Sequence, residues 1–153
     1  MSEHKATIRW THTSGEFLKG RYSREHTWTF DGGLTVPASP SPSSVPKPYS
    51  NEANLDPEEA FVASISSCHM LTFLFLAMKA GFEVASYEDD AVGVLTKDER
   101  NIPWVSSVTL QPRIVYGGEK RPSAEEESRL HHGAHEQCFI ANSVKTEVTV
   151  RSR

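Results

Sequence analysis

Short runs of alternating apolar and polar residues characterise the N-terminal part of the chain. Residues 5–12 and 26–30 alternate with the period of two that half-buried strands show. Asp31, Gly32 and Gly33 tolerate the backbone angles of a tight turn and precede the apolar run 34–36. This pattern predicts a strand followed by a hairpin. The next segment, residues 37–50, is rich in proline and serine without periodicity, which predicts a surface loop.

A long apolar helix is predicted to begin after Asp56 and to end at Gly81. Asp56 suits the N-cap, Pro57 suits the first helical position, and Glu59 completes a capping box. The second half of this helix is apolar on nearly every side, so we expect a buried central helix. Because one small sheet covers little of such a helix, we expect a second copy of the chain to cover the rest.

The C-terminal half is predicted to contain a second hairpin, a second helix and a final strand. Strands are predicted over 86–96 and 104–116, a helix over 124–140 after a capping box, and a strand over 144–150. The order strand, hairpin, helix, hairpin, helix, strand is typical of an α+β fold with mainly antiparallel pairing. The length of 153 residues fits one domain, residues 1–153.

Composition and charge narrow the classes of function. The chain is 37% hydrophobic and 24% charged, as globular proteins are. A formal net charge of -4 offers no basic surface to nucleic acid. Residues 1–13 are too polar for a signal peptide, and the apolar run 70–80 is too short to span a bilayer. We therefore expect a cytoplasmic protein that binds neither nucleic acid nor membrane.

Two cysteines, Cys68 and Cys138, are the candidate reactive groups. Each has an apolar flank and is predicted on a helix with an apolar stripe, so the two thiols could meet in the core. Two inert core thiols would produce the same pattern, because free cysteine behaves as a small hydrophobe. A reactive Cys68 in mid-helix needs a cation from elsewhere to lower its pKa. The candidates for that cation are Arg21 and Arg24.

Two segments resemble the OsmC/Ohr family, the osmotically induced and organic hydroperoxide resistance proteins. The helix around the family's first cysteine is similar to DPEEAFVASISSCHMLTFL, including the proline–glutamate pair at 57–58. The second cysteine segment of the family is similar to AHEQCFIANSV, and the order of elements matches nearly throughout. The resemblance implies an OsmC-like fold, an intertwined homodimer in which sheets wrap around two long buried central helices, with active sites at the interface.

The resemblance also implies a thiol peroxidase and assigns roles to four residues. Cys68 matches the peroxidatic cysteine, which attacks an organic hydroperoxide, and Cys138 matches the resolving cysteine, which closes a disulfide. Glu58 matches a glutamate that pairs with an arginine, for which we favour Arg24 over Arg21. An external dithiol, such as a dihydrolipoyl group on a protein, would reduce the disulfide, and no cofactor is expected.

The spacing of Glu58 and Cys68 limits how these roles combine. The ten residues between them span about 15 Å on an unbroken helix, too far to share one arginine. Either the helix breaks, or Glu58 serves the cysteine of a partner subunit, which we prefer. Several apolar residues near the cysteines suit either bulky peroxides or plain core packing: Phe61, Met70, Phe73 and Phe139.

Two other functions remain open. Histidines and cysteines on and near the second helix could offer zinc a set of ligands, although their spacing matches no common zinc motif. These residues are His131, His132, His135 and Cys138, with Cys68 and His69 from the first helix. A non-enzymatic member of the fold would instead bind a small apolar ligand between subunits. Consumption of thiols by peroxide would indicate the peroxidase, and bound zinc would indicate the zinc-binding protein. Neither result would favour the non-enzymatic binding protein.

Overall fold

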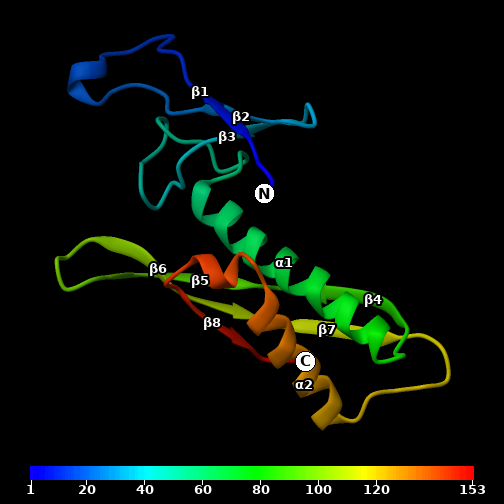
Figure 1. Cartoon of the computed structure of the whole chain (residues 1–153). Helices are drawn as coiled ribbons and strands as arrows, with labels where there is room; N and C mark the ends of the chain where they lie inside the picture. The colour runs from blue at the N-terminus through cyan, green and yellow to red at the C-terminus, as the bar shows by residue number, and fades with distance from the viewer. The chain divides into compact units, whose positions relative to one another are not determined.

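The computed structural model describes all 153 residues, which form two compact units, residues 1–60 and residues 61–153. Figure 1 shows the elements of both units in chain order. Helix α1 (Pro57–Lys79) begins in the first unit and lies mostly in the second. The combination of helices with mainly antiparallel sheets confirms the predicted α+β fold class.

The first unit contains a three-stranded antiparallel sheet in the order β1-β2-β3. Strands β2 (His26–Phe30) and β3 (Thr35–Ala38) form the predicted hairpin, and Gly33 in its turn has a φ of 88°. Strand β1 (Ala6–Arg9) pairs with β2 and is shorter than predicted. The short 3-10 helix η1 (Phe17–Lys19) interrupts the loop between β1 and β2. The predicted surface loop 37–50 is confirmed only in part, because its first two residues belong to β3 and Ser39 and Ser50 are buried, while turns and bends follow over 42–50.

Helix α1 begins at the predicted capping box. The carboxylate of Asp56 accepts the backbone N–H of Glu59 at 2.7 Å, and the carboxylate of Glu59 accepts the backbone N–H of Asp56 at 3.1 Å. Gly81, with a φ of 80°, follows the end of the helix, where a left-handed residue terminates helices most readily. Both ends of the predicted helix are therefore confirmed, and the helix between them is continuous.

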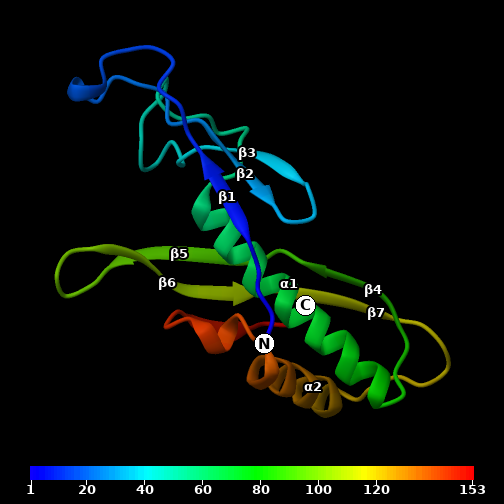
Figure 2. The same cartoon turned by 45° about the horizontal axis from the view of Figure 1, so that its top comes forward.

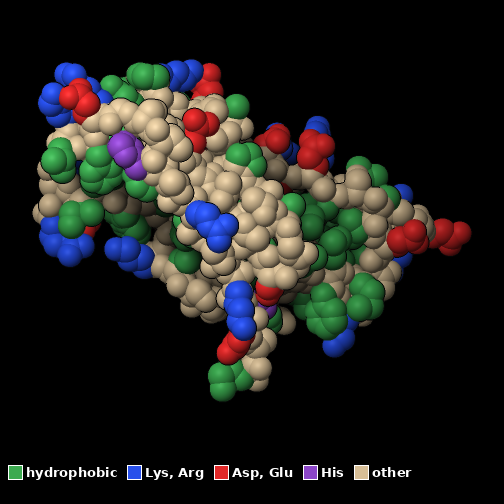
Figure 3. All heavy atoms as spheres, turned by 90° about the horizontal axis from the view of Figure 1, so that it is seen from above, with side chains coloured by type: hydrophobic (Ala, Val, Ile, Leu, Met, Phe, Trp, Pro, Cys, Tyr) green, Lys and Arg blue, Asp and Glu red, His purple; other side chains and the backbone are tan.

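Only one face of α1 is buried within the chain. The buried residues recur at every fourth position, namely Ile65, His69, Phe73 and Ala77. Large apolar side chains on the other faces stay at least 50% exposed, namely Leu71, Phe75 and Met78. In Figure 3, a group of exposed apolar side chains lies on the right-hand side, where the C-terminal end of α1 lies in Figure 1. Within one chain the helix is therefore buried on one face, and the burial of its other faces by a second copy stays a prediction.

The whole of α1 is long and apolar enough to cross a membrane, judged by length and composition alone. The apolar run 70–80 considered above is shorter than this helix of 23 residues. Core helices of globular proteins meet the same criteria, and α1 contributes Ile65 and Phe73 to the core of the second unit. The length of α1 is therefore weak evidence for a membrane.

Each of the two long strands predicted after α1 is divided into two. The four strands are β4 (Val84–Asp89), β5 (Val92–Lys97), β6 (Pro103–Leu110) and β7 (Pro112–Tyr116). Strands β4 and β7 form one antiparallel sheet, and β5 and β6 pair in another. The last strand, β8 (Glu147–Val150), runs parallel to β6 at the edge of that second sheet.

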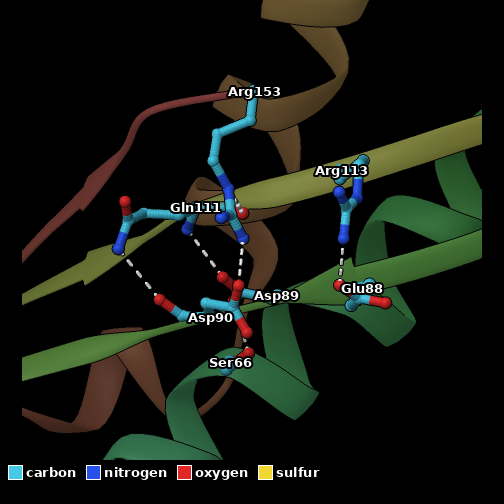
Figure 4. Close-up of polar contacts among 7 residues, drawn as sticks. All are labelled: Ser66, Glu88, Asp89, Asp90, Gln111, Arg113 and Arg153. Carbon is cyan, nitrogen blue, oxygen red and sulfur yellow. Dashed lines mark hydrogen bonds and ion pairs between the residues drawn. The ribbon is translucent and has the colours of Figure 1, made fainter.

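Polar side chains bind to the backbone where the strands are divided, as Figure 4 shows. Asp89 accepts the backbone N–H of Gln111 at 2.6 Å and the hydroxyl of Ser66 at 2.5 Å. Arg153 donates to the carboxylate of Asp90 at 2.6 Å and to the carbonyl of Gln111 at 3.0 Å. These side chains satisfy backbone groups that strand pairing leaves free, and they join α1 to both sheets.

Helix α2 (Ala124–Gln137) begins at the second predicted capping box, where Ser123 and Glu126 exchange hydrogen bonds of 3.2 and 2.8 Å. It ends at Gln137, before the predicted end at residue 140. Cys138 is the C-cap, with extended backbone angles of -70° and 116°. The prediction that Cys138 lies within the helix is therefore wrong. The short 3-10 helix η2 (Ala141–Ser143) follows.

Two apolar clusters form the core of the second unit. One joins α1 and α2 to β4 and β7 through Phe73 and Ala134, and Figures 1 and 2 show the two helices side by side. The other joins α1 to β6 through Ile65, Val108 and Leu110. Helix α1 thus contributes to both clusters, and Cys68 lies between Ile65 of one cluster and Phe73 of the other.

Candidate active site

The structure brings the two predicted cysteines together. Cys68 is half-buried in the middle of α1, and Cys138 is fully buried at the end of α2, both as free thiols. Burial raises the pKa of the Cys138 thiol, and a hydrogen bond with the Cys68 thiol raises it further. The backbone N–H of Ala141 donates to Cys138 Sγ at 3.4 Å and favours the thiolate. The two thiols therefore lie near each other, as a disulfide between them requires.

The turn that carries Cys138 is held by its own backbone and by Asn142. The side-chain amide of Asn142 donates to the carbonyls of Glu136 and Cys138 at 2.8 and 2.9 Å. The backbone N–H of Cys138 donates to the carbonyl of His135 at 3.4 Å. The sequence offers one signal for Asn142, because an asparagine close to a helix end is typical of side-chain capping.

An open groove of about 630 Å³ lies beside the two cysteines. Its lining combines α1 with the end of α2, namely Leu71, Thr72, Phe75, Glu136, Gln137, Phe139 and Asn142. The hydroxyl of Thr72 donates to the backbone carbonyl of Cys68 at 3.0 Å, which ties the groove to the cysteine turn. Phe139 is 83% exposed here. The groove therefore offers apolar surface formed by residues that lie near the cysteines along the chain, although neither cysteine lines it.

The four apolar residues singled out near the cysteines have different positions. Phe73 is fully buried in the core between α1 and α2, and Phe61 packs against the second core cluster. Met70 is half-buried on α1, and Phe139 lines the open groove. Plain core packing thus accounts for Phe73 and Phe61, whereas Phe139 remains available for contact with a ligand or a partner.

Arg24 and Arg21 differ in their bonding within the first unit. The guanidinium of Arg24 donates to the carbonyls of Gly20 and Tyr22, at 3.2 and 2.8 Å, and lies 4.0 Å from the centre of the Tyr22 ring. It forms no ion pair, whereas Arg21 is exposed and pairs with Glu16 at 3.2 Å. Arg24 therefore carries a positive charge with no acidic partner, as an arginine that serves an anionic site would.

Glu58 is half-buried in the first turn of α1 and forms no ion pair with Arg24. Since α1 is continuous from Pro57 to Lys79, the alternative of a break between Glu58 and Cys68 is excluded. The two residues are thus separated by about 15 Å along the helix axis. Within one chain, a single arginine cannot bind both.

The histidines on α1 and α2 do not assemble the zinc site that the sequence left open. His69 Nε2 and His131 Nδ1 lie 3.0 Å apart in a hydrogen bond, and burial lowers the pKa of both side chains to about 4. His132 is exposed and lies 3.2 Å from Glu136. No group of three histidine, cysteine, aspartate or glutamate side chains is arranged to hold a metal ion.

Comparisons with known proteins agree with this architecture. Residues 50–153 match the family model described as OsmC-like protein. An OsmC-like protein of unknown function from Vibrio cholerae is 51% identical over 100% of both chains, with a TM-score of 0.97. The organic hydroperoxide resistance protein OhrB of Bacillus subtilis is 21% identical, covering 99% of this chain and 98% of its own, with a TM-score of 0.68.

A third structure, an organic hydroperoxide resistance protein from Elizabethkingia anophelis, is 18% identical, covering 99% of this chain and 94% of its own, with a TM-score of 0.73. At these lower identities, the likeness establishes a shared fold. Among curated proteins, none matches the chain.

Proposed function

Because this chain belongs to the OsmC-like family, we propose that it is a thiol-dependent peroxidase that reduces organic hydroperoxides through Cys68 and Cys138. The observation that supports this proposal most directly is the contact between the two thiols, which lie far apart in the sequence. A half-buried thiol beside a fully buried one suits a division of labour between an attacking and a resolving cysteine. Two proteins with the same fold are organic hydroperoxide resistance proteins, and the proposed reaction with organic hydroperoxides agrees with their names.

In the proposed reaction, the Cys68 thiolate attacks one oxygen of the peroxide and the O–O bond breaks. The released alkoxide takes a proton and leaves as an alcohol, and Cys68 becomes a sulfenic acid. Cys138 then attacks that sulfur, water leaves, and a disulfide forms. An external dithiol supplies two electrons and two protons to restore both thiols. The raised pKa of Cys138 keeps it protonated, which favours Cys68 for the first attack.

Arg24 is proposed to stabilise the Cys68 thiolate and to orient the peroxide. The absence of a carboxylate partner within the same chain supports this role, because it leaves the guanidinium available to the thiolate and to a glutamate of a second copy. Glu58 is proposed to position an arginine at the active site of the partner subunit. The continuous helix α1 supports that arrangement, since Glu58 and the Cys68 of its own chain are too far apart to share one arginine.

We further propose a cytoplasmic homodimer in which a second copy covers the exposed face of α1. The exposed fractions of Leu71 and Met78 are 61% and 60%, and Phe139 is exposed beside them. Contiguous apolar surface of this kind marks an interaction site. A second copy of the chain is the occupant that the resemblance to an intertwined dimer favours.

Steady-state peroxide consumption tests the proposed roles, with cumene hydroperoxide as the substrate and dihydrolipoamide as the reductant. We expect Cys68→Ser to abolish turnover, and Cys138→Ser to allow one oxidation without recycling. Arg24→Lys should lower kcat/KM by about tenfold or more, because lysine loses the bidentate geometry of the guanidinium. The matched variant Arg21→Lys should change it little. Full activity in both cysteine variants would contradict the two-cysteine mechanism.

A further inference from the structure

A buried histidine pair joins α1, which carries Cys68, to α2, which ends just before Cys138. His69 on α1 and His131 on α2 are 1% and 5% exposed. Their rings are stacked, with centroids 5.3 Å apart and planes 11° from parallel, and a hydrogen bond of 3.0 Å links His69 Nε2 to His131 Nδ1. The ring of Phe73 lies 4.4 Å from that of His131 and closes one side of the pair.

This hydrogen bond joins side chains of α1 and α2 directly, in addition to the contact of Cys68 with Cys138 at the end of α2. The remaining contacts between the helices are apolar, as where Phe73 and Ala77 pack near Ala134. Apolar contacts are non-directional, so they constrain the sliding of one helix along the other through packing alone. A buried hydrogen bond is directional, and leaving its donor or acceptor unpaired costs free energy. The pair therefore fixes the register of α1 against α2.

The pair is close to both cysteines along the chain. His69 directly follows Cys68 on α1, and His131 lies seven residues before Cys138, which is about 10 Å along α2. A shift of either helix along its axis would move its cysteine by the same amount. Because a disulfide requires its two Cβ atoms to lie within a narrow range of distances, such a shift would oppose disulfide formation.

We propose that His69 and His131 are positioning residues that hold the helices in the register in which Cys138 meets Cys68, and that they thereby set how readily this disulfide forms. This proposal rests on the proposed two-cysteine function. The histidines act through the helices, and neither takes part in the exchange of electrons.

The surroundings of the pair keep it uncharged at neutral pH. The titratable groups that face His69 are His131 and His135 from α2 and Asp89 from β4. The charge of Asp89 favours the protonated form of His69, but burial and the two neighbouring histidines outweigh it. The neutral pair thus joins the helices with one donor and one acceptor.

Equilibrium with dithiothreitol tests the proposal without any peroxide. The protein dithiol transfers two electrons and two protons to oxidised dithiothreitol, which becomes reduced, and the protein disulfide forms. The disulfide fraction is measured by intact mass after acid quenching, over a series of redox buffers at neutral pH. We expect His131→Leu, which keeps volume but loses the hydrogen bond, to lower the equilibrium constant by about tenfold or more.

Two variants on α2 serve as rescue and control. His131→Asn keeps a polar atom near the position of Nδ1 and should restore most of the loss. His132→Leu replaces the exposed neighbouring histidine and should leave the constant unchanged. Thermal unfolding of the reduced variants by circular dichroism separates a loss of fold from a loss of register. A folded His131→Leu variant with the constant of the unmodified chain would overturn the proposal.

A second pair of variants decides the matter if His131→Leu does not fold. His69→Gln places its amide near the position of Nε2, whereas His69→Asn is one methylene too short to reach His131. The glutamine variant should form the disulfide about as readily as the unmodified chain, and the asparagine variant should form it less readily. Equal constants would refute the positioning role.

An unmodified chain that forms no disulfide would overturn both the two-cysteine mechanism and this proposal, whereas a normal disulfide without peroxide turnover would overturn the peroxidase alone.

Discussion

Acidification should destabilise the fold through the buried histidine pair. The pKa of His69 is lowered from 6.5 to about 4, chiefly by burial, and burial lowers that of His131 to about 4 as well. Between pH 4 and 6.5, the unfolded chain therefore binds more protons than the folded chain, so the free energy of unfolding rises with pH in this window. For one histidine, a pKa shift of this size contributes on the order of 3 kcal/mol to the free energy of unfolding. This contribution is fully present above pH 6.5 and is lost as the pH falls toward 4.

The assay is urea unfolding of the reduced protein, followed by circular dichroism at fixed protein concentration from pH 4 to pH 7.5. The comparison chain carries His69→Gln and His131→Asn, which keep polar atoms at the paired positions and do not titrate. Because the unmodified chain carries two such histidines and the variant carries neither, the unmodified chain should lose up to about 6 kcal/mol more than the variant between pH 7 and pH 4. Equal losses in both chains would refute the argument that the pair is buried and neutral.

Three further predictions concern packing, polar contacts and assembly. Gly93→Ala should lower the free energy of unfolding by roughly 1–3 kcal/mol in urea titrations, because the new Cβ would lie 2.4 Å from Val62 Cγ2. Ser66→Ala removes a donor to the half-buried carboxylate of Asp89 and should cost about 1–3 kcal/mol by the same measurement. Phe139→Ser should raise the concentration at which the proposed dimer dissociates in sedimentation velocity, because it removes exposed apolar surface. An unchanged dissociation would place Phe139 outside the interface.

Features that depend on neighbouring residues could be predicted from the sequence. The capping boxes of Asp56 with Glu59 and of Ser123 with Glu126 close within three residues, and both form as expected. Gly81 likewise ends α1 through its own backbone preference. The fold class follows from the order of such elements.

Features that depend on distant contacts were missed or misjudged. The division of the long strands relies on Asp89 reaching Gln111, 22 residues away, and nothing in the local pattern indicates that bond. The contact of His69 with His131 spans 62 residues, so His131 looked like part of a polar helix face. The apolar residues after Cys138 continued the helical pattern and concealed the end of α2.

The candidate site was predicted in part. The contact of Cys68 with Cys138 was expected from the apolar flanks and the family resemblance, and the structure places the two thiols together. The roles of Arg24 and Glu58 remain predictions, because they depend on a partner subunit. The choice of Arg24 over Arg21 also stays a prediction, to which the structure adds that Arg21 pairs with Glu16 whereas Arg24 bonds to backbone carbonyls.

The intact mass of the reduced, metal-free protein, before and after one equivalent of cumene hydroperoxide, tests the central claim most directly. The two-cysteine mechanism predicts the loss of two hydrogens per chain, reversed by dihydrolipoamide and absent in Cys68→Ser. An unchanged mass, with both thiols still reactive toward an alkylating reagent after denaturation, would contradict it.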